Sequence, residues 1–121
     1  MISGKMIEAI NSQIDKEKYS AFLYMAMSAK AEGLGYAGVA NWFMVQYHEE
    51  IFHAMKFYRY LLEQDAAPAI ERIEKPQLKG EGVLSMFEQA LEHEKTVTAA
   101  IHNLAALAEA ENDHASGNLF Q

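Results

Sequence analysis

The fold of this chain is decided by the stretch Tyr47-His48-Glu49-Glu50-Ile51-Phe52-His53-Ala54-Met55-Lys56-Phe57. The stretch contains strong helix formers and neither glycine nor proline, so it is expected to be helical. Glu50 and His53 are three residues apart and therefore lie on one face of such a helix, about one turn from each other. A carboxylate and an imidazole placed in this way can bind one metal ion. A metal site here needs further carboxylates from other helices.

The length and composition favour one helical domain. The chain has 121 residues, half of them apolar, with only two prolines and seven glycines. Its formal net charge of −7 disfavours a nucleic-acid partner, because such binding depends on Lys and Arg that neutralise phosphates. No apolar run reaches the roughly 18 residues that span a bilayer, so no membrane partner is expected. The absence of cysteine excludes thiolate ligands and suits a cytoplasmic location.

Three long helices are predicted from apolar residues that repeat every three or four positions. They cover about residues 3–32, 36–64 and 82–110. Gly33 suits the left-handed position after the first helix, and the short turn there makes the second helix antiparallel to the first. The third helix is expected to face the core with the following residues: Leu84, Phe87, Leu91, Glu94, Thr98, Ile101, Ala105 and Ala108.

A long connection is predicted between the second and third helices. Residues 65–81 contain Pro68, Pro76 and Gly80 and show no helical period. Fully extended, this segment reaches about 55 Å, whereas the second helix is about 43 Å long. The connection can therefore cross the whole bundle, so that the third helix runs parallel to the second. Simple up-and-down bundles need no such connection, and a bundle with one long crossover is expected.

Each of the three helices carries a carboxylate in the middle of its apolar face. These carboxylates belong to Glu17, Glu50 and Glu94, and the imidazole of His53 joins them. Helices aligned side by side place the four groups at one level of one core. Burying an ionised carboxylate without a counter-charge is costly, and no Lys or Arg occupies these faces at that level. A metal cation is the simplest counter-charge, and this donor set suits Fe, Mn or Mg.

Each of these residues also has a structural explanation. A Glu and a His three residues apart are common on solvated helix faces, and a single Glu in an apolar row is often an edge residue. The coincidence on three helices favours the metal site. Tyr24 lies on the face of Glu17 and can bond a ligand or donate an electron, while Gln46 and Thr98 can support ligands by hydrogen bonds. Four other histidines are expected in solvent: His48, His93, His102 and His114.

Five segments of the chain resemble the bacterial non-haem ferritins. They are Glu17–Tyr24, Asn41–Phe43, Glu49–Lys56, Glu92–Glu94 and Asp113–Ser116. The resemblance implies a single all-α domain, a ferritin-like four-helix bundle with a long crossover between the second and third helices. It also implies iron storage in a hollow shell of many copies. Fe(II) is then oxidised to Fe(III) by oxygen or peroxide at a di-iron ferroxidase centre.

The same resemblance assigns roles to four residues of the predicted site. Glu17 and His53 hold the first iron. Glu50 bridges the two irons, and Glu94 holds the second iron. These roles require the side chains to converge in the middle of the bundle.

Three further positions complete what the resemblance implies. Glu49 helps to form an outer third iron site, although by itself it would be a surface residue. Tyr24 matches the tyrosine that lies beside the centre. No haem is expected, because Phe52 stands where bacterioferritin-like relatives have their haem-binding Met. A rubrerythrin-like peroxidase is disfavoured because no Cys is available for the rubredoxin iron that such a protein also has.

In the ferritin family, a fourth helix adds Glu and Gln groups to the centre and completes the bundle. This sequence includes only the start of such a helix, about residues 113–121, where Asp113 suits an N-cap. Two interpretations stay open: the residues belong to a longer ferritin, or a truncated form covers its apolar strip by pairing with another copy. The alternative function is a helical assembly module that dimerises or oligomerises and has an incomplete metal site.

Overall fold

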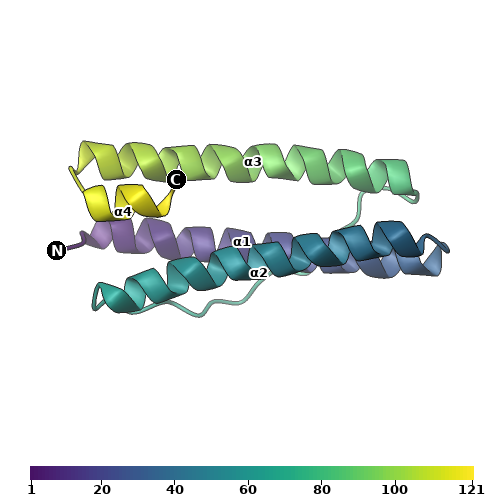
Figure 1. The fold of residues 1–121 in the computed structure, drawn as a ribbon, viewed down its shortest axis with the longest axis horizontal. Helices are drawn as coiled ribbons and strands as arrows, with labels where there is room; N and C mark the ends of the chain where they lie inside the picture. The colour runs from purple at the N-terminus through teal and green to yellow at the C-terminus, as the bar shows by residue number, and fades with distance from the viewer.

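The structure is a computed structural model that describes residues 1–121, and it contains four helices. α1 covers Gly4–Gly33, α2 covers Ala37–Glu63, α3 covers Val83–Ala110 and α4 covers His114–Leu119. The three long helices lie along a common direction, and the short α4 folds back beside α3 (Figure 1). The all-α fold predicted from the sequence is confirmed. None of the helices combines the length and the apolar content that crossing a bilayer requires.

The ends of α1 are set by a side-chain cap and a glycine turn. Ser3 Oγ accepts a hydrogen bond from the Met6 amide at 3.0 Å, which satisfies one of the free N–H groups at the helix start. At the other end, Gly35 has the left-handed backbone, with φ of 88°. The prediction that Gly33 takes this position is wrong, because the helix continues through Gly33 and turns only after Leu34.

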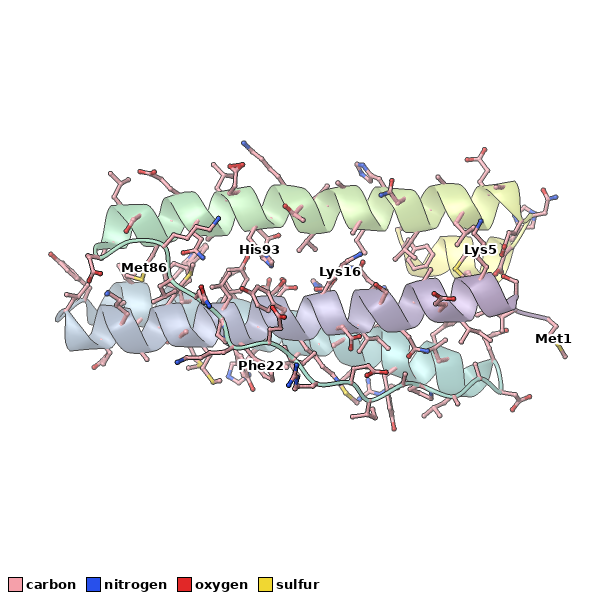
Figure 2. The ribbon with its side chains drawn as sticks, turned by 180° about the vertical axis from the view of Figure 1, so that it is seen from behind. Met1, Lys5, Lys16, Phe22, Met86 and His93 are labelled. Atoms are coloured by element: carbon pink, nitrogen blue, oxygen red, sulfur yellow. The ribbon has the colours of Figure 1, made fainter.

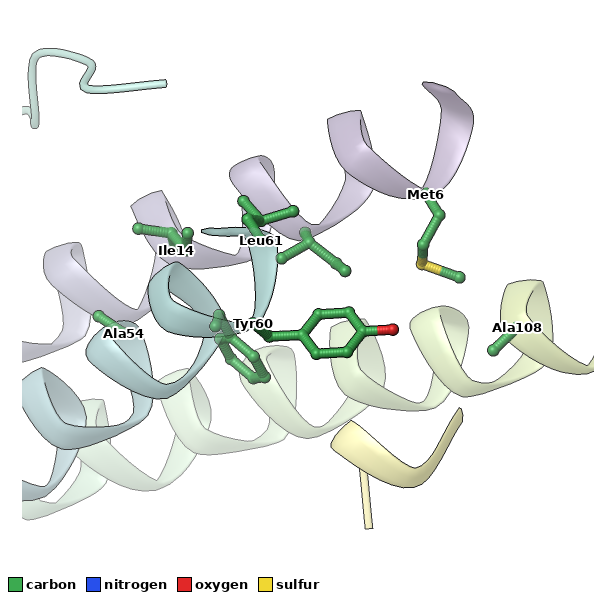
Figure 3. Close-up of a cluster of buried hydrophobic side chains, with 8 residues drawn as sticks. Met6, Ile14, Ala54, Tyr60, Leu61 and Ala108 are labelled. Carbon is green, nitrogen blue, oxygen red and sulfur yellow. The ribbon is translucent and has the colours of Figure 1, made fainter. Parts of the chain in front are cut away.

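α2 runs antiparallel to α1 and packs along most of its length (Figure 1). Two apolar clusters form this contact, and α3 adds a few residues to each. The first cluster, drawn in Figure 3, contains Met6, Ile10, Ile14, Ala54, Phe57, Tyr60, Leu61 and Ala108. The second cluster contains Leu23, Tyr24, Met27, Ala31, Ala40, Phe43, Met86 and Ala90. The stretch of α1 between the clusters buries polar side chains instead: Gln13, Glu17 and Ser20.

The connection between α2 and α3 crosses the bundle from one end to the other (Figure 2). It contains residues 64–82 and no helix or strand. The first part of the connection is bound by the side chain of Asn11 on α1. Asn11 donates a hydrogen bond to the Ala67 carbonyl at 3.4 Å and accepts one from the Ala69 amide at 2.8 Å. The predicted long crossover is therefore present and lies against α1.

Contacts at both ends of α1 fix the direction of α3. Glu81, just before α3, forms an ion pair with Lys30 near the end of α1 at 2.9 Å. At the opposite end, Ser3 Oγ donates a hydrogen bond to Glu111 Oε1 at 2.6 Å. α3 is therefore antiparallel to α1 and parallel to α2, as predicted.

α3 buries a second apolar row against α1 and only part of the predicted face. Its buried residues are Met86, Ala90, Val97, Leu104 and Ala108. Of the predicted face, Leu84 and Leu91 are 73% and 59% exposed. α3 has two apolar faces that fit the helical period equally well. The prediction is wrong for Leu84 and Leu91, because α3 packs on α1 while few contacts join it to α2. It holds for Ala108, which is buried, and for Ile101, which packs against the first cluster.

Candidate metal centre

In the middle of the bundle, three side chains from α1 and α2 that can each bind a metal ion lie close together. One carboxylate oxygen of Glu17, one of Glu50 and one ring nitrogen of His53 lie within 4.8 Å of one another. His53 Nδ1 is 3.8 Å from Glu17 Oε2 and 3.8 Å from Glu50 Oε2. Glu50 and His53 share a face of α2 one turn apart, and α1 places Glu17 opposite them. Three of the four predicted residues therefore meet.

The two carboxylates of this cluster are buried, and the imidazole lies between them and solvent. The side chains of Glu17 and Glu50 are 2% and 7% exposed, whereas that of His53 is 47% exposed. Glu17 Oε2 and Glu50 Oε2 have no hydrogen-bond partner. A buried charged oxygen without a partner is costly. Two oxygens and one nitrogen that converge in this way fit a shared cation such as Fe(II).

The proximity of these groups shifts their pKa values in different directions. Burial, together with the neighbouring Glu17 carboxylate, raises the pKa of Glu50 to about 7. Burial also opposes the ionisation of Glu17, but the contacts with His53, Glu50 and Gln13 outweigh it and lower the pKa of Glu17. The two carboxylates raise the pKa of His53 to about 10. Without a metal, protons on His53 and Glu50 therefore supply the counter-charge.

Glu94 faces the same space but is held by a different contact. A hollow of about 310 Å³ is lined by Glu17, Glu50, His53 and Glu94. The phenol of Tyr24 donates a hydrogen bond to Glu94 Oε1. Burial and this bond raise the pKa of Tyr24 above its ordinary value, so the phenol stays protonated. Glu94 is therefore at the hollow but outside the close group of three.

The other predicted residues lie farther from the cluster. Glu49 is exposed and shares a separate surface hollow with His53. The structure therefore does not bring Glu49 into the group formed with Glu17 and Glu50. Thr98 is exposed but lines the same hollow as Glu17, Glu50 and Glu94. Gln46 is half-buried and does not line that hollow.

Comparison with known proteins identifies the family. The model of the ferritin-like domain matches residues 7–121 of the chain. The chain belongs to the ferritin family. A bacterial non-heme ferritin of Staphylococcus aureus (strain USA300) is 34% identical over 116 residues, which cover 96% of this chain and 70% of that protein.

Solved ferritin structures have the same fold as this ferritin chain. An open-pore ferritin from the archaeon Archaeoglobus fulgidus superimposes with a TM-score of 0.96 at 40% identity, covering 100% of this chain and 75% of that chain. A humanized archaeal ferritin superimposes with a TM-score of 0.97 at 41% identity and is covered to 73%. The predicted ferritin-like bundle is confirmed, and the chain is shorter than these ferritins.

In this ferritin chain, His93 lies against α1 rather than in solvent, so that prediction is wrong. His93 Nε2 is 2.6 Å from Ser20 Oγ. Ser20 Oγ is also 2.9 Å from the Lys16 carbonyl, so the hydroxyl lies between the ring and the backbone of α1. The ring also packs between Tyr19 and Tyr24. Burial lowers the pKa of His93, which favours the neutral ring. The sequence pattern did not indicate this contact, because His93 lies off the face of α3 that was predicted to be buried.

Gln13 is a second residue of the ferritin bundle that was not predicted from the sequence. Its side chain is buried, and its Nε2 donates a hydrogen bond to Glu17 Oε1 at 3.0 Å. Gln13 lies beside the row of α1 that contains Ile10, Ile14 and Glu17, and not within it. The signal that finds it is a polar residue one turn before a buried Glu on the same side of the helix.

Proposed function

We propose that this chain stores iron and oxidises Fe(II) to Fe(III) at the carboxylate cluster in the middle of the bundle. The observation that carries the proposal is the pair of buried, unpartnered oxygens of Glu17 and Glu50 that face His53 Nδ1. Membership of the ferritin family supports it. Fe(II) is the substrate here, and each ion that is oxidised gives one electron to oxygen or peroxide.

The proposal gives each residue of the hollow a role. Glu17 and His53 bind the first iron, and Glu50 is proposed to bridge the first and the second iron. Glu94 binds the second iron from α3. Tyr24 holds Glu94 by its hydrogen bond and stays protonated while doing so. In this arrangement the first iron has all its proposed protein ligands on α1 and α2.

The proton balance of the cluster favours exchange of protons for a divalent cation. Without a metal, a proton on His53 and a partial proton on Glu50 offset the buried charges. A ligand must lose its proton to bind a metal, so binding releases protons. The cation then satisfies Glu17 Oε2 and Glu50 Oε2 together, neither of which has a hydrogen-bond partner in the protein.

Two further parts of the proposal lie outside the close group. Glu49 is exposed beside His53 and offers an outer carboxylate to an iron that approaches or leaves the cluster. Assembly of many copies into a shell is proposed from family membership, with a dimer or another small assembly as the alternative. In one copy, the side chains of Leu84 and Leu91 on α3 are exposed and available for such assembly.

Addition of Fe(II) in air to the purified chain tests the proposal. We expect a rapid rise in absorbance as Fe(III) forms, and loss of that rise in Glu50→Ala. Glu63→Ala is the matched control, because Glu63 is an exposed carboxylate on the same helix. A rise of wild-type rate in Glu50→Ala would remove the proposed site.

The second candidate function is a helical assembly module with an incomplete metal site. The exposure of Leu84 and Leu91 on α3 favours it. Anomalous scattering at the iron edge, measured on crystals grown with Fe(II), separates the two functions. Anomalous density among Glu17, Glu50 and His53 would count against the assembly module. A lack of anomalous density at that position would count against iron oxidation there.

A further inference from the structure

The buried amide of Gln13 contacts one of the proposed metal ligands and no other side chain by a hydrogen bond. Gln13 is 1% exposed and lies one turn before Glu17 on α1. A buried amide is costly unless it is hydrogen-bonded. The bond it makes, from Nε2 to Glu17 Oε1, is 3.0 Å long. The Glu17 carboxylate therefore has a hydrogen-bond donor at this position, where an apolar side chain of the same size would leave Oε1 without one.

The hydrogen bond makes the two oxygens of Glu17 different from each other. Oε1 accepts from Gln13, whereas Oε2 is buried without a partner and lies 3.8 Å from His53 Nδ1. The side chain of Glu17 is 2% exposed, so both oxygens depend on partners inside the bundle. We propose that Gln13 is a positioning residue that orients the Glu17 carboxylate so that Oε2 alone faces the metal.

This inference rests on the proposed metal site and adds a reason for its geometry. An amide N–H₂ group only donates and does not titrate, so it holds Oε1 at every pH at which the chain is folded. A carboxylate held by one oxygen cannot rotate freely to chelate a metal with both. Groups that orient a ligand in this way commonly change metal affinity by about 10- to 100-fold when they are removed.

The inference is tested by replacing the donor with a side chain of similar length. Gln13→Met keeps an unbranched side chain of good helix propensity and removes the hydrogen bond. Co(II) is the probe, because its visible spectrum reports the coordination geometry and its titration gives a dissociation constant. We expect Gln13→Met to bind Co(II) about 10- to 100-fold more weakly than wild type, with an altered spectrum.

Met27→Leu is the control for a change in the core. Met27 is buried on the same helix, in the apolar cluster on the far side of Glu17. Its replacement is expected to leave the Co(II) affinity and spectrum unchanged. Gln13→Asn is a second test, because its amide is one methylene shorter and does not reach Glu17. It is expected to behave like Gln13→Met.

The outcomes separate this inference from the proposal on which it rests. If wild type does not bind Co(II), the metal site and the role of Gln13 both fall. If wild type binds and both Gln13 variants bind with the same affinity and spectrum, the metal site stands and the role of Gln13 is overturned. If neither variant folds, Gln13 is a requirement of the fold and the positioning role is overturned as well.

Discussion

At the scale of single residues, protons and a cation compete for the same atoms in the middle of the bundle. Burial and the neighbouring Glu17 carboxylate raise the pKa of Glu50 to about 7, and the contacts with Glu17 and Glu50 raise that of His53 to about 10. Both groups therefore bind protons more tightly in the folded than in the unfolded chain. This makes the stability of the metal-free protein depend on pH in a defined direction.

We predict that the free energy of unfolding, measured in urea with a chelator present, falls as pH rises from about 5 to 9, because the two raised pKa values outweigh the lowered pKa of His93, which acts in the opposite direction below 6.5. A group whose pKa is raised by folding stabilises the fold below its unfolded pKa and loses this contribution as pH passes its folded pKa. For Glu50 the window runs from 4.5 to about 7, and for His53 from 6.5 to about 10. Glu50→Gln should flatten the lower part of the curve. A wild-type stability that does not change across this range would contradict these shifts.

The hydrogen bond between Tyr24 and Glu94 gives a second prediction at this scale. Tyr24→Phe removes the donor and leaves the Glu94 carboxylate without a partner in the hollow. Hydrogen bonds to charged groups contribute about 1.5–3 kcal/mol when both partners are buried, and Glu94 is half-exposed, so we expect a loss near the lower value. Urea unfolding measures it. Tyr19→Phe is the control, since the Tyr19 phenol is partly exposed and a surface change is expected to stay within about 0.5 kcal/mol. Equal effects of the two changes would contradict the assignment.

At the scale of helices, the success of prediction depends on how many faces a helix buries. The row of α1 was predictable because Ile10, Ile14, Ala21 and Tyr24 repeat on one face that α2 then covers. α3 carries a second apolar row, and only its contact with α1 selects Met86 and its neighbours for burial. A sequence does not contain that choice, because it depends on where the other helices lie.

The candidate site divides in the same way between local and distant information. Glu50 and His53 were predictable because their spacing places them on one face of one helix. Glu17 was predictable from its interruption of an apolar row. Glu94 is nearby, but its hydrogen bond with Tyr24 joins residues 70 positions apart and follows only from the packing of α3 on α1. Tertiary contacts of this kind leave no periodic signal.

The junction between the crossover and α3 gives a prediction about one element. A Cβ at Gly80 would collide with the Cβ and Oγ of Ser85. Ser85 cannot move away freely, because its hydroxyl accepts from the Gly82 amide at 3.2 Å and donates to the Gly82 carbonyl at 2.8 Å. We expect Gly80→Ala to destabilise the protein by about 1–3 kcal/mol, the range for overpacking.

Thermal unfolding followed by circular dichroism measures this change. Gly38→Ala is the control, because Gly38 lies within α2 and a Cβ there meets nothing within 4 Å. Replacing a helical glycine with alanine in open space is expected to stabilise by about 0.5–1 kcal/mol. The two Gly→Ala changes should therefore have opposite signs. An increase in stability for Gly80→Ala would show that the close approach of the crossover to Ser85 is not required.

At the scale of the whole molecule, α3 is the least supported of the long helices. It packs on α1 and touches α2 at few places. One contact to α2 is made by Phe87, whose ring lies 5.3 Å from that of Trp42 between centroids, although Trp42 is 46% exposed. α4 covers one end of the space between α2 and α3, where Tyr60 and Ser116 share a hydrogen bond of 2.8 Å. The remaining length of α3 keeps large apolar side chains in solvent.

Self-association through this uncovered part of α3 is the prediction that follows. Leu84 and Leu91 lie seven residues apart on one face of α3 and are 73% and 59% exposed, and contiguous apolar surface of this kind favours association. We expect the wild-type chain to sediment above the monomer mass of 13.6 kDa in analytical ultracentrifugation, increasingly so with concentration. Leu84→Glu combined with Leu91→Glu should shift it toward the monomer without loss of helical content. Thr96→Glu combined with Asn103→Glu adds the same charges, at the same spacing, to exposed positions on another face of α3, and should leave the mass unchanged. A wild-type chain that stays monomeric at every concentration, or an equal shift in both double variants, would show that association does not depend on these leucines.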